Sequence, residues 1–547
     1  MKKYILLFFS LLVISPLFTR DIKLTESSNQ FKIVSNSTSE FTFVNYLSNV
    51  SFKMIKKDNQ RFVKILVDGY GENANSGEAE LPALEELIDV PIDSDILIEI
   101  INKEEKLVSL SDYNLSAPIF PSQPSILKSQ NIEDVPFYHN TDYYSFDGFY
   151  KNDIVKTEVL GVMRGRRLAR LSINPFSYNP VTNEINVVTK LEVKISFQNY
   201  DQVKDNHNKQ KYFSPEFEKL FKTCINYKSD SYKDVITTYP VKYVIISDPM
   251  FQTAIQPLVE WKTRKGFEVI EGYTNDPMVG NTTSSIHAFI KSMYDNATLT
   301  NPPPTYLLIV GDDAQVPSFS GLTGSHLSDM YYCEFDGNGD FYPEMYYGRF
   351  SATTAGEVEA QVSKTLSHEQ YTFSDPSFLD DIVLVAGVDA SMAPTYGNGQ
   401  INYGTDNYFN SNAGLNVHTY LYGSGTPITT DQPAASAAII SDISNGSSFA
   451  NYTAHCGSSG WGDPSFVVSD ISGLQNYDKF GVLVGNCCQS NKFDVPECFG
   501  EAILRASNKG AVGYIGGSNN TYWDEDYWWA VGNTSNFTSN PTYAGTG

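Results

Sequence analysis

The sequence predicts an α/β fold with a mostly parallel sheet flanked by helices, preceded by a β-rich region. From Tyr239 onwards, short apolar runs alternate with amphipathic helical segments, which is typical of parallel strands covered by helices. Before about residue 238, runs of β-branched and aromatic residues are separated by Asn, Asp, Ser and Pro. A chain of 547 residues is too long for one ordinary domain, so a division into two or three is expected.

Residues 21–238 are predicted to form the β-rich domain and a linker. The alternation in "LEVKISF" (191–197) is that of a half-buried strand. The stretch 199–235 is polar and weakly helical, which indicates an exposed and cleavable connector.

Residues 239–547 are predicted to form the α/β domain. The expected strands are 241–248, 267–273, 305–313, 381–387, 448–456, 480–488 and 511–517, and the expected helices are 251–266, 284–296, 355–371, 436–446 and 498–510. In such sheets, ligands bind beyond the carboxyl ends of the strands. Polar clusters such as "GDD", "NCCQS" and "GSNN" follow these strands, so the functional site is expected there.

The first 20 residues have the layout of a signal peptide. Lys2 and Lys3 precede an apolar run from Tyr4 to about Phe18, which is short for a membrane span. A buried N-terminal helix is the alternative. We therefore expect a secreted or cell-surface protein that is not integral to a membrane. The net charge of −24 argues against a nucleic-acid partner.

The six cysteines predict neither a disulfide framework nor a zinc site. Cys224, Cys333 and Cys456 are widely scattered in a chain large enough to fold without such links. No pair of cysteines shows zinc-ligand spacing with matching histidines.

A cysteine and a histidine are expected at the same edge of the sheet. His455 follows one predicted strand, and Cys487 and Cys488 end another. Such a pair is the minimum for thiolate catalysis, and the tight turns beside it offer backbone N–H groups to an oxyanion. Two plain alternatives remain: a buried cysteine often acts as a small hydrophobe, and His455 could be a core histidine.

These motifs resemble those of the gingipain-type cysteine peptidases. "NYTAHCGSSGWGDPSF" is similar to their Tyr-Thr-small-His motif, with Trp461 six residues after the histidine. "CQSNKFDVPECFGEAILRA" resembles their nucleophile segment, and "MYYGRFSATTAGEVEAQVSKTLSHE" resembles a segment that precedes a helix. Residues 21–238 are similar to the family's prodomain, most clearly at "RRLARLSINPFSYNPVTNEINVV".

The resemblance implies a caspase-like fold and a set of catalytic residues. Cys488 is the implied nucleophile, because Phe493 then lies five residues later as in the family. Strand alternation turns Cys487 to the opposite face, where it packs inward. His455 is the implied base or ion-pair partner. Asp389 matches the family's orienting carboxylate, although the best-known members have Glu, and it could instead be a turn residue.

The resemblance also implies a substrate pocket, from which this sequence departs. Asn402 matches the position of an acidic residue that binds arginine, so the pocket is expected to carry no charge, although Asp406 lies close by. Trp523 and Trp461 are expected to bind substrate, although Trp523 could equally be core packing. Cys456 replaces the glycine that follows the family's histidine.

Catalysis is expected to need no cofactor, but structural calcium is a hypothesis. Asp336, Asn338 and Asp340 place oxygen ligands at alternate positions, as at the start of an EF-hand loop. The completing glutamate is missing, so a polar turn is the alternative.

The sequence thus predicts a secreted cysteine endopeptidase made as a zymogen, acting on proteins or peptides through a thioester. Its own prodomain is the expected inhibitor, and a basic residue of the prodomain is expected to enter the cleft. Four arginines are candidates: Arg164, Arg166, Arg167 and Arg170. The alternative is that these arginines form the solvated face of a strand. The rivals are a catalytically silent adhesion or peptide-binding protein and a peptidase with acidic or Asn specificity. Because family members continue further, the chain is expected to extend past Gly547.

Overall fold

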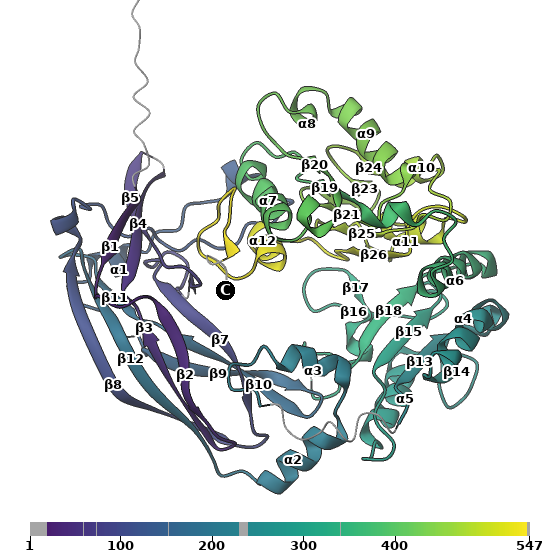
Figure 1. The fold of residues 1–547 in the computed structure, drawn as a ribbon, viewed down its shortest axis with the longest axis horizontal. Helices are drawn as coiled ribbons and strands as arrows, with labels where there is room; N and C mark the ends of the chain where they lie inside the picture. The colour runs from purple at the N-terminus through teal and green to yellow at the C-terminus, as the bar shows by residue number, and fades with distance from the viewer. Residues whose placement is uncertain are drawn as a thin grey trace, which may run out of the picture.

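The computed structural model describes residues 19–57, 59–72, 74–150, 152–228, 239–337, 339 and 341–543. An antiparallel β region lies beside two smaller α/β units, and the chain enters the second unit last (Figure 1). The predicted signal peptide lies almost wholly outside the described residues. Within those residues, no helix has the length and apolar character that a membrane crossing requires.

The N-terminal region consists of antiparallel sheets, as the sequence predicted. Their orders are β1-β4-β5, β6-β7-β10-β9 and β11-β12-β3-β2, with β8 also paired to β12. Buried and partly exposed residues alternate along most of β12, as expected for a half-buried strand. The strands are β1 (Thr19–Lys23), β2 (Gln30–Asn36), β3 (Glu40–Tyr46), β4 (Asn49–Lys57), β5 (Gln60–Leu66), β6 (Gly71–Glu72), β7 (Pro82–Val90), β8 (Asp95–Ser109), β9 (Val155–Met163), β10 (Arg166–Ile173), β11 (Phe176–Asn179) and β12 (Glu184–Gln198).

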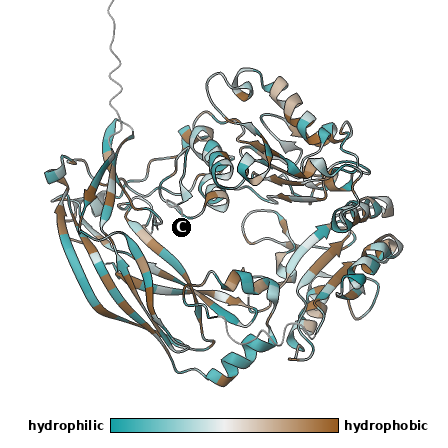
Figure 2. Cartoon of the chain, viewed as in Figure 1, coloured by the Kyte–Doolittle hydropathy of each residue, from teal (hydrophilic) through white to brown (hydrophobic). Residues whose placement is uncertain are grey.

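A helical connector leads to the C-terminal region. It contains α2 (Gln202–Lys211) and α3 (Pro215–Phe221), and a further short helix, α1 (Thr141–Ser145), lies within the β region. Most of α2 is hydrophilic, which agrees with the polar linker expected there (Figure 2). The part expected to be cleavable falls partly on residues 229–238, which lie outside the described residues.

The predicted α/β fold is confirmed, with the strands divided between two parallel sheets. The first has the order β14-β13-β15-β18 and the second β20-β19-β21-β25-β26. Their strands are β13 (Lys242–Ser247), β14 (Glu268–Tyr273), β15 (Tyr306–Val310), β18 (Tyr346–Phe350), β19 (Asp381–Val385), β20 (Asn416–Tyr420), β21 (Phe449–Tyr452), β25 (Val482–Gly485) and β26 (Gly513–Gly516). Short hairpins complete the region: β16 (Phe319–Ser320), β17 (Leu327–Ser328), β22 (Cys456–Gly457), β23 (Gly460–Trp461) and β24 (Phe466–Val467).

Helix α6 (Ala355–Gln370) begins at a capping box formed by Thr354 and Glu357. Thr354 accepts the N–H of Glu357, whose carboxylate accepts the N–H of Thr354 in return. The helices are α4 (Gln252–Arg264), α5 (Thr283–Asp295), α6 (Ala355–Gln370), α7 (Asn398–Asn407), α8 (Pro427–Thr430), α9 (Gln432–Asn445), α10 (Val468–Ile471), α11 (Phe499–Arg505) and α12 (Trp523–Val531). Helix α6 contacts both α4 of the first unit and α11 of the second. It therefore links the two parallel units.

A buried lysine supports this link. Lys364 of α6 donates from Nζ to the carbonyl oxygens of Leu504 at 2.6 Å, Ala506 at 3.0 Å and Lys509 at 3.2 Å. The carbonyls of Leu504 and Ala506 lie at the end of α11, where a helix has no partners of its own for them, and Lys509 lies in the turn that follows. Burial lowers the pKa of Lys364 to about 7.

Replacing Lys364 by methionine is expected to lower the free energy of unfolding by about 1–3 kcal/mol, because the buried carbonyls lose their donor. Urea unfolding followed by circular dichroism measures this loss. The matched control is Lys291→Met, which removes an exposed ion pair with Asp295 and is expected to cost about 0.3–0.5 kcal/mol. An equal loss of unfolding free energy in the two variants would contradict a special role for Lys364.

Candidate active site

Neighbouring strands of the second sheet bring the predicted site residues to one edge. Tyr452, the last residue of β21, pairs with Gly485, the last residue of β25. His455 and Cys488 each lie three residues beyond that pair. Asp389 follows β19, which lies on the other side of β21. Because the strands are parallel, all three side chains start from the carboxyl edge of the sheet.

Asp389 is anchored and orients His455. Its Oδ2 lies 2.9 Å from His455 Nε2, and its Oδ1 accepts the backbone N–H of Ser391 and of Met392. The hydrogen bond with His455 is the main cause that holds the pKa of Asp389 below its usual range. Since Nε2 is engaged, Nδ1 is the ring nitrogen left for other chemistry.

Cys488 follows β25 and lies beside the segment that follows β26. Its side chain is buried, and the backbone N–H of Thr521 points to Sγ at 3.4 Å. Trp523 stands edge-on to the His455 ring, with centroids 5.5 Å apart. Thr521 also donates from Oγ1 to Asp526 at 2.7 Å. Cysteine, histidine, tryptophan and a carboxylate therefore surround one small space.

A lysine from the N-terminal region fills this space. Lys128 is 1% exposed, and its Nζ lies 2.7 Å from Asp526 Oδ2 and 2.7 Å from the carbonyl oxygen of Asn486. Nζ also lies 3.4 Å from Thr453 Oγ1 and 4.8 Å from the centroid of the Trp523 ring. Burial lowers the pKa of Lys128, while the charge of Asp526 opposes that shift.

The backbone around Lys128 pairs with the site as a strand. The Lys128 N–H donates to the carbonyl of Thr521 at 2.9 Å, and the Trp523 N–H donates to the carbonyl of Ile126 at 3.0 Å. Leu127 forms an antiparallel bridge with Tyr522. An extended peptide is bound in this way when it adds a strand to an exposed edge.

The prediction that Asn402 forms the base of an uncharged substrate pocket stays a prediction, but Asn402 is not among the residues that contact Lys128. Asn402 lies on α7 and donates from Nδ2 to the carbonyl of Ser539 at 2.7 Å. The charged group in the pocket is Asp526, three residues after Trp523 on α12. Sequence reasoning missed it because an ungapped match to the family motif points to Asn402 instead. The i, i+3 spacing of Trp523 and Asp526 on one helix face was the available signal.

The two predicted tryptophans have different surroundings. Trp461 is 0% exposed and stacks on Tyr452 with centroids 5.0 Å apart, inside the core of the sheet. Trp461 is therefore enclosed by other side chains, and its role in binding substrate stays a prediction. Trp523 instead presents its ring to the ammonium group of Lys128.

The sequence predicted no disulfide framework and an inward-packing Cys487, but it did not foresee the one disulfide that is present. Cys456 and Cys487 are bonded, with their Cα atoms 5.4 Å apart. Cys487 packs inward as expected, but it does so as half of this bridge. The two cysteines are 31 residues apart in sequence and become neighbours because β21 and β25 are adjacent in the sheet. Cys488 is one of the free thiols.

None of the four candidate arginines enters the pocket. Arg164 is buried and donates from Nη1 to the carbonyls of Pro304 and Glu344, far along the chain from the site. The other three bind partners within the N-terminal region: Arg166 pairs with Asp89, Arg167 donates to the Ser94 carbonyl, and Arg170 pairs with Glu158. The residue type was anticipated, but the basic residue in the pocket is Lys128.

The calcium hypothesis stays a prediction. Asn338 and Asp340 lie outside the described residues, and burial raises the pKa of Asp336. In the part of the chain that the structure describes, no three His, Cys, Asp or Glu residues gather as metal ligands. The neighbouring carboxylates of Glu334 and Glu344 accept backbone N–H groups of Gly339 and Phe335.

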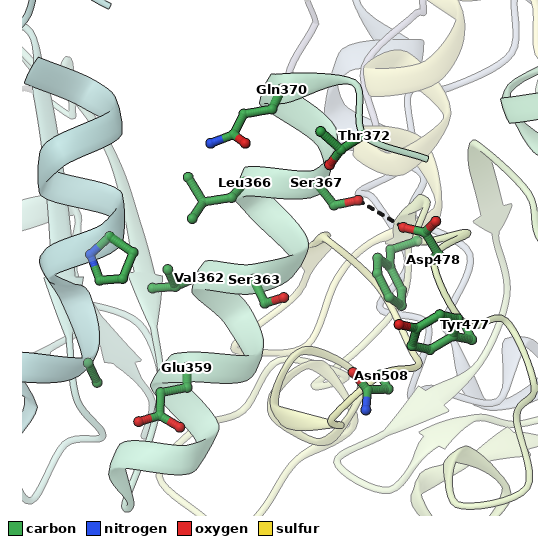
Figure 3. A pocket seen from close by; sticks show the side chains of 13 residues that line it. Glu359, Val362, Ser363, Leu366, Ser367, Gln370, Thr372, Tyr477, Asp478 and Asn508 are labelled. Atoms are coloured by element: carbon green, nitrogen blue, oxygen red, sulfur yellow. Dashed lines mark hydrogen bonds between the residues drawn. The ribbon is translucent and has the colours of Figure 1, made fainter. Parts of the chain in front are cut away.

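A separate cavity of about 410 Å³ lies among α4, α6 and the segment 477–480 (Figure 3). Its wall includes Val362, Leu366 and Ser367 of α6, and Ser367 donates to Asp478 at 3.0 Å. None of the predicted site residues lines it. The predicted catalytic residues therefore lie at the sheet edge and not in this cavity.

Comparison with known proteins agrees with the geometry. The model of peptidase family C25 matches residues 236–544, and the C25 propeptide model matches residues 23–236. The chain belongs to peptidase family C25. Lys-gingipain W83 of Porphyromonas gingivalis is 35% identical over 552 residues, covering 100% of this chain and 31% of the relative. Gingipain R1 of the same organism is 26% identical over 495 residues, covering 87% of this chain and 47% of the relative.

A solved structure, described as "Structure of Protease", is also similar to this chain. It has a TM-score of 0.51 and 36% sequence identity, and it covers 58% of this chain and 68% of its own. The predicted gingipain-type membership is thus confirmed. The chain spans about a third of the length of its Lys-gingipain relatives, since 31% of the first of them is matched.

Proposed function

We propose that the chain is the zymogen of a secreted cysteine endopeptidase that cleaves after lysine. The observation that carries this is Lys128, seated beside Cys488 with its ammonium on Asp526. The chain continues on both sides of Lys128, so the site accepts an internal residue of a polypeptide. Secretion rests on the leader-like residues at the start of the chain.

In the proposed reaction, the Cys488 thiolate attacks the carbonyl carbon of the lysine residue. The proton of the thiol passes to His455, whose orientation Asp389 fixes. His455 then gives the proton to the leaving amine, and a thioester remains on Cys488. Water, deprotonated by His455, hydrolyses the thioester and restores the thiol. The backbone N–H of Cys488 is proposed to bind the oxyanion.

The number of hydrogen-bond acceptors in the pocket matches the number of donors on a lysine ammonium group. An ammonium group has three N–H donors, and three oxygens surround Lys128 Nζ: Asp526 Oδ2, the Asn486 carbonyl and Thr453 Oγ1. A planar guanidinium would need a wider, forked arrangement. Relatives with the name Lys-gingipain support the same preference.

Lys128 is proposed to block the site without being cleaved. Directly after it the chain turns, since the Gln130 N–H donates to the Leu127 carbonyl at 2.9 Å. Gln130 Oε1 also accepts the Leu127 N–H. The peptide bond after Lys128 is therefore held in a turn, whereas a substrate is expected to continue extended through the cleft.

Replacing Lys128 by alanine is expected to raise the peptidase activity of the unprocessed chain at least about tenfold, because a buried charge pair that holds the prodomain is lost. Hydrolysis of a lysyl fluorogenic peptide by full-length protein measures the effect. Lys204→Ala, which removes an exposed pair with Asp93 inside the N-terminal region, is the control and should stay latent. An unchanged latency in the Lys128→Ala variant would show that Lys128 does not block the site.

The function itself is tested with peptides that vary the residue before the scissile bond. The full chain is first nicked in its prodomain by a glutamate-specific protease, which does not cleave lysyl reporters. We expect cleavage after lysine, weak cleavage after arginine, and none after aspartate or asparagine. Binding of the lysyl peptide without cleavage would instead support the catalytically silent peptide-binding protein.

A further inference from the structure

A disulfide joins the immediate neighbours of the two proposed catalytic residues. Cys456 directly follows His455, Cys487 directly precedes Cys488, and the two are bonded. We propose that this disulfide is a clamp that holds the imidazole and the thiol in their reacting geometry. Activity then requires Cys456 and Cys487 to be joined in the disulfide and Cys488 to be a free thiol. The inference rests on the proposed function and adds positioning residues to it.

The clamp lies beyond the end of the β ladder. The backbone bond from the Asn486 N–H to the Tyr452 carbonyl, at 2.9 Å, continues the pairing of β25 with β21. After it, the Cys487 N–H turns back to the carbonyl of Gly485 in its own segment, at 2.8 Å. The disulfide therefore joins the two segments where the backbone pairing has stopped.

Other contacts fix each residue separately. The His455 carbonyl accepts the N–H of Gly462 and the hydroxyl of Tyr452, both at 2.9 Å. Cys488 Sγ accepts the N–H of Thr521, which lies in the segment after β26. The disulfide fixes the position of His455 relative to that of Cys488. This relation matters because a misplacement of about 1 Å between reacting groups can cost about 100-fold in rate.

The clamp is open to reductant on one side. Cys487 is fully buried, whereas Cys456 is only partly buried. A small dithiol is expected to attack Cys456 Sγ and expel the Cys487 thiolate. Its second thiol then closes to a cyclic disulfide and releases the Cys456 thiol, so two electrons pass from the dithiol to the clamp.

The test compares the nicked full chain with the Cys456→Ala/Cys487→Ala double variant. Lysyl-peptide kinetics give kcat and KM at a temperature well below unfolding. Mass spectrometry gives the rate at which iodoacetamide alkylates Cys488 as a function of pH. Each protein is assayed with a monothiol that keeps Cys488 reduced, then with dithiothreitol, then after reoxidation.

In the double variant we expect kcat to fall about 10- to 100-fold, with KM changed less than about threefold. Alkylation of Cys488 should become slower across the pH range, because His455 is no longer held where it can take up the proton of the thiol. Dithiothreitol should lower the activity of the parent protein to that of the variant, reoxidation should restore it, and the variant should not respond.

A lower melting temperature with unchanged kcat and unchanged alkylation profile would overturn the clamp, because the disulfide would then support only the fold. The alkylation measurement also separates this inference from the proposed function. If no form cleaves lysyl peptides, the peptidase proposal fails. The clamp is then judged by the alkylation profiles alone, and identical profiles overturn it.

Discussion

Replacing Cys488 by alanine is expected to lower kcat/KM for lysyl peptides by about 10⁴- to 10⁶-fold, as for other nucleophiles that act together with a base. The variant keeps His455, Asp389 and the Lys128 pocket but has no atom that can form the thioester. The loss should fall on kcat, because the pocket that binds the lysine side chain is intact. Steady-state kinetics on the nicked full chain measure it.

The matched control is Cys333→Ala, which removes another buried free thiol, in the first α/β unit. It is expected to keep its activity and its labelling by a thiol-directed active-site probe. In the parent protein that probe should modify Cys488 and leave Cys487 unmodified, since Cys487 is in the disulfide. Undiminished cleavage by the Cys488→Ala variant would remove the basis of the mechanism.

The sequence could predict the site's core because local patterns determine it. Each apolar run announces a strand, and helices between the strands require parallel pairing. Residues after the strands must then meet at one edge. For that reason His455 and Cys488, 33 positions apart in sequence, could be placed together, and the register of Tyr452 with Gly485 gives both the same offset. Asp389 follows by the same argument from β19.

The pocket could not be predicted, because its parts meet only in three dimensions. Lys128 contacts Asn486 and Thr453, which are 358 and 325 positions away in sequence. No periodicity in a β-rich region indicates which of its basic residues will reach a distant sheet. Four arginines in one motif were a more visible signal than a single lysine in a loop.

The disulfide escaped prediction for a related reason. Cys456 and Cys487 are close because β21 and β25 are neighbours, and the strand order was not available from the sequence. The general argument that a large chain needs no disulfides concerns stability. It does not apply to a bridge that lies beside reactive residues, where positioning is the expected benefit.

Replacing Asp526 by asparagine is expected to lower kcat/KM for lysyl peptides by about 30- to 1,000-fold, the effect of removing one partner of a buried charge pair. Asparagine has the same shape and can still accept the hydrogen bond that Thr521 donates, so the variant tests charge and not packing. Peptides with a neutral residue before the scissile bond should be cleaved at an unchanged, low rate. Glu525→Gln, an exposed neighbour on α12, is the control and should leave both rates unchanged.

The same substitution should also weaken latency, because Lys128 relies on the same carboxylate as the substrate. For lysyl cleavage by the unprocessed chain, Asp526→Asn and Lys128→Ala are therefore expected to have opposite effects. For the access of a small alkylating reagent to Cys488, both are expected to give an increase. In the double variant, the gain in access should be smaller than the sum of the single gains, since both changes break one interaction. Additive gains would mean that Lys128 and Asp526 act independently, and the pocket assignment would then have to be abandoned.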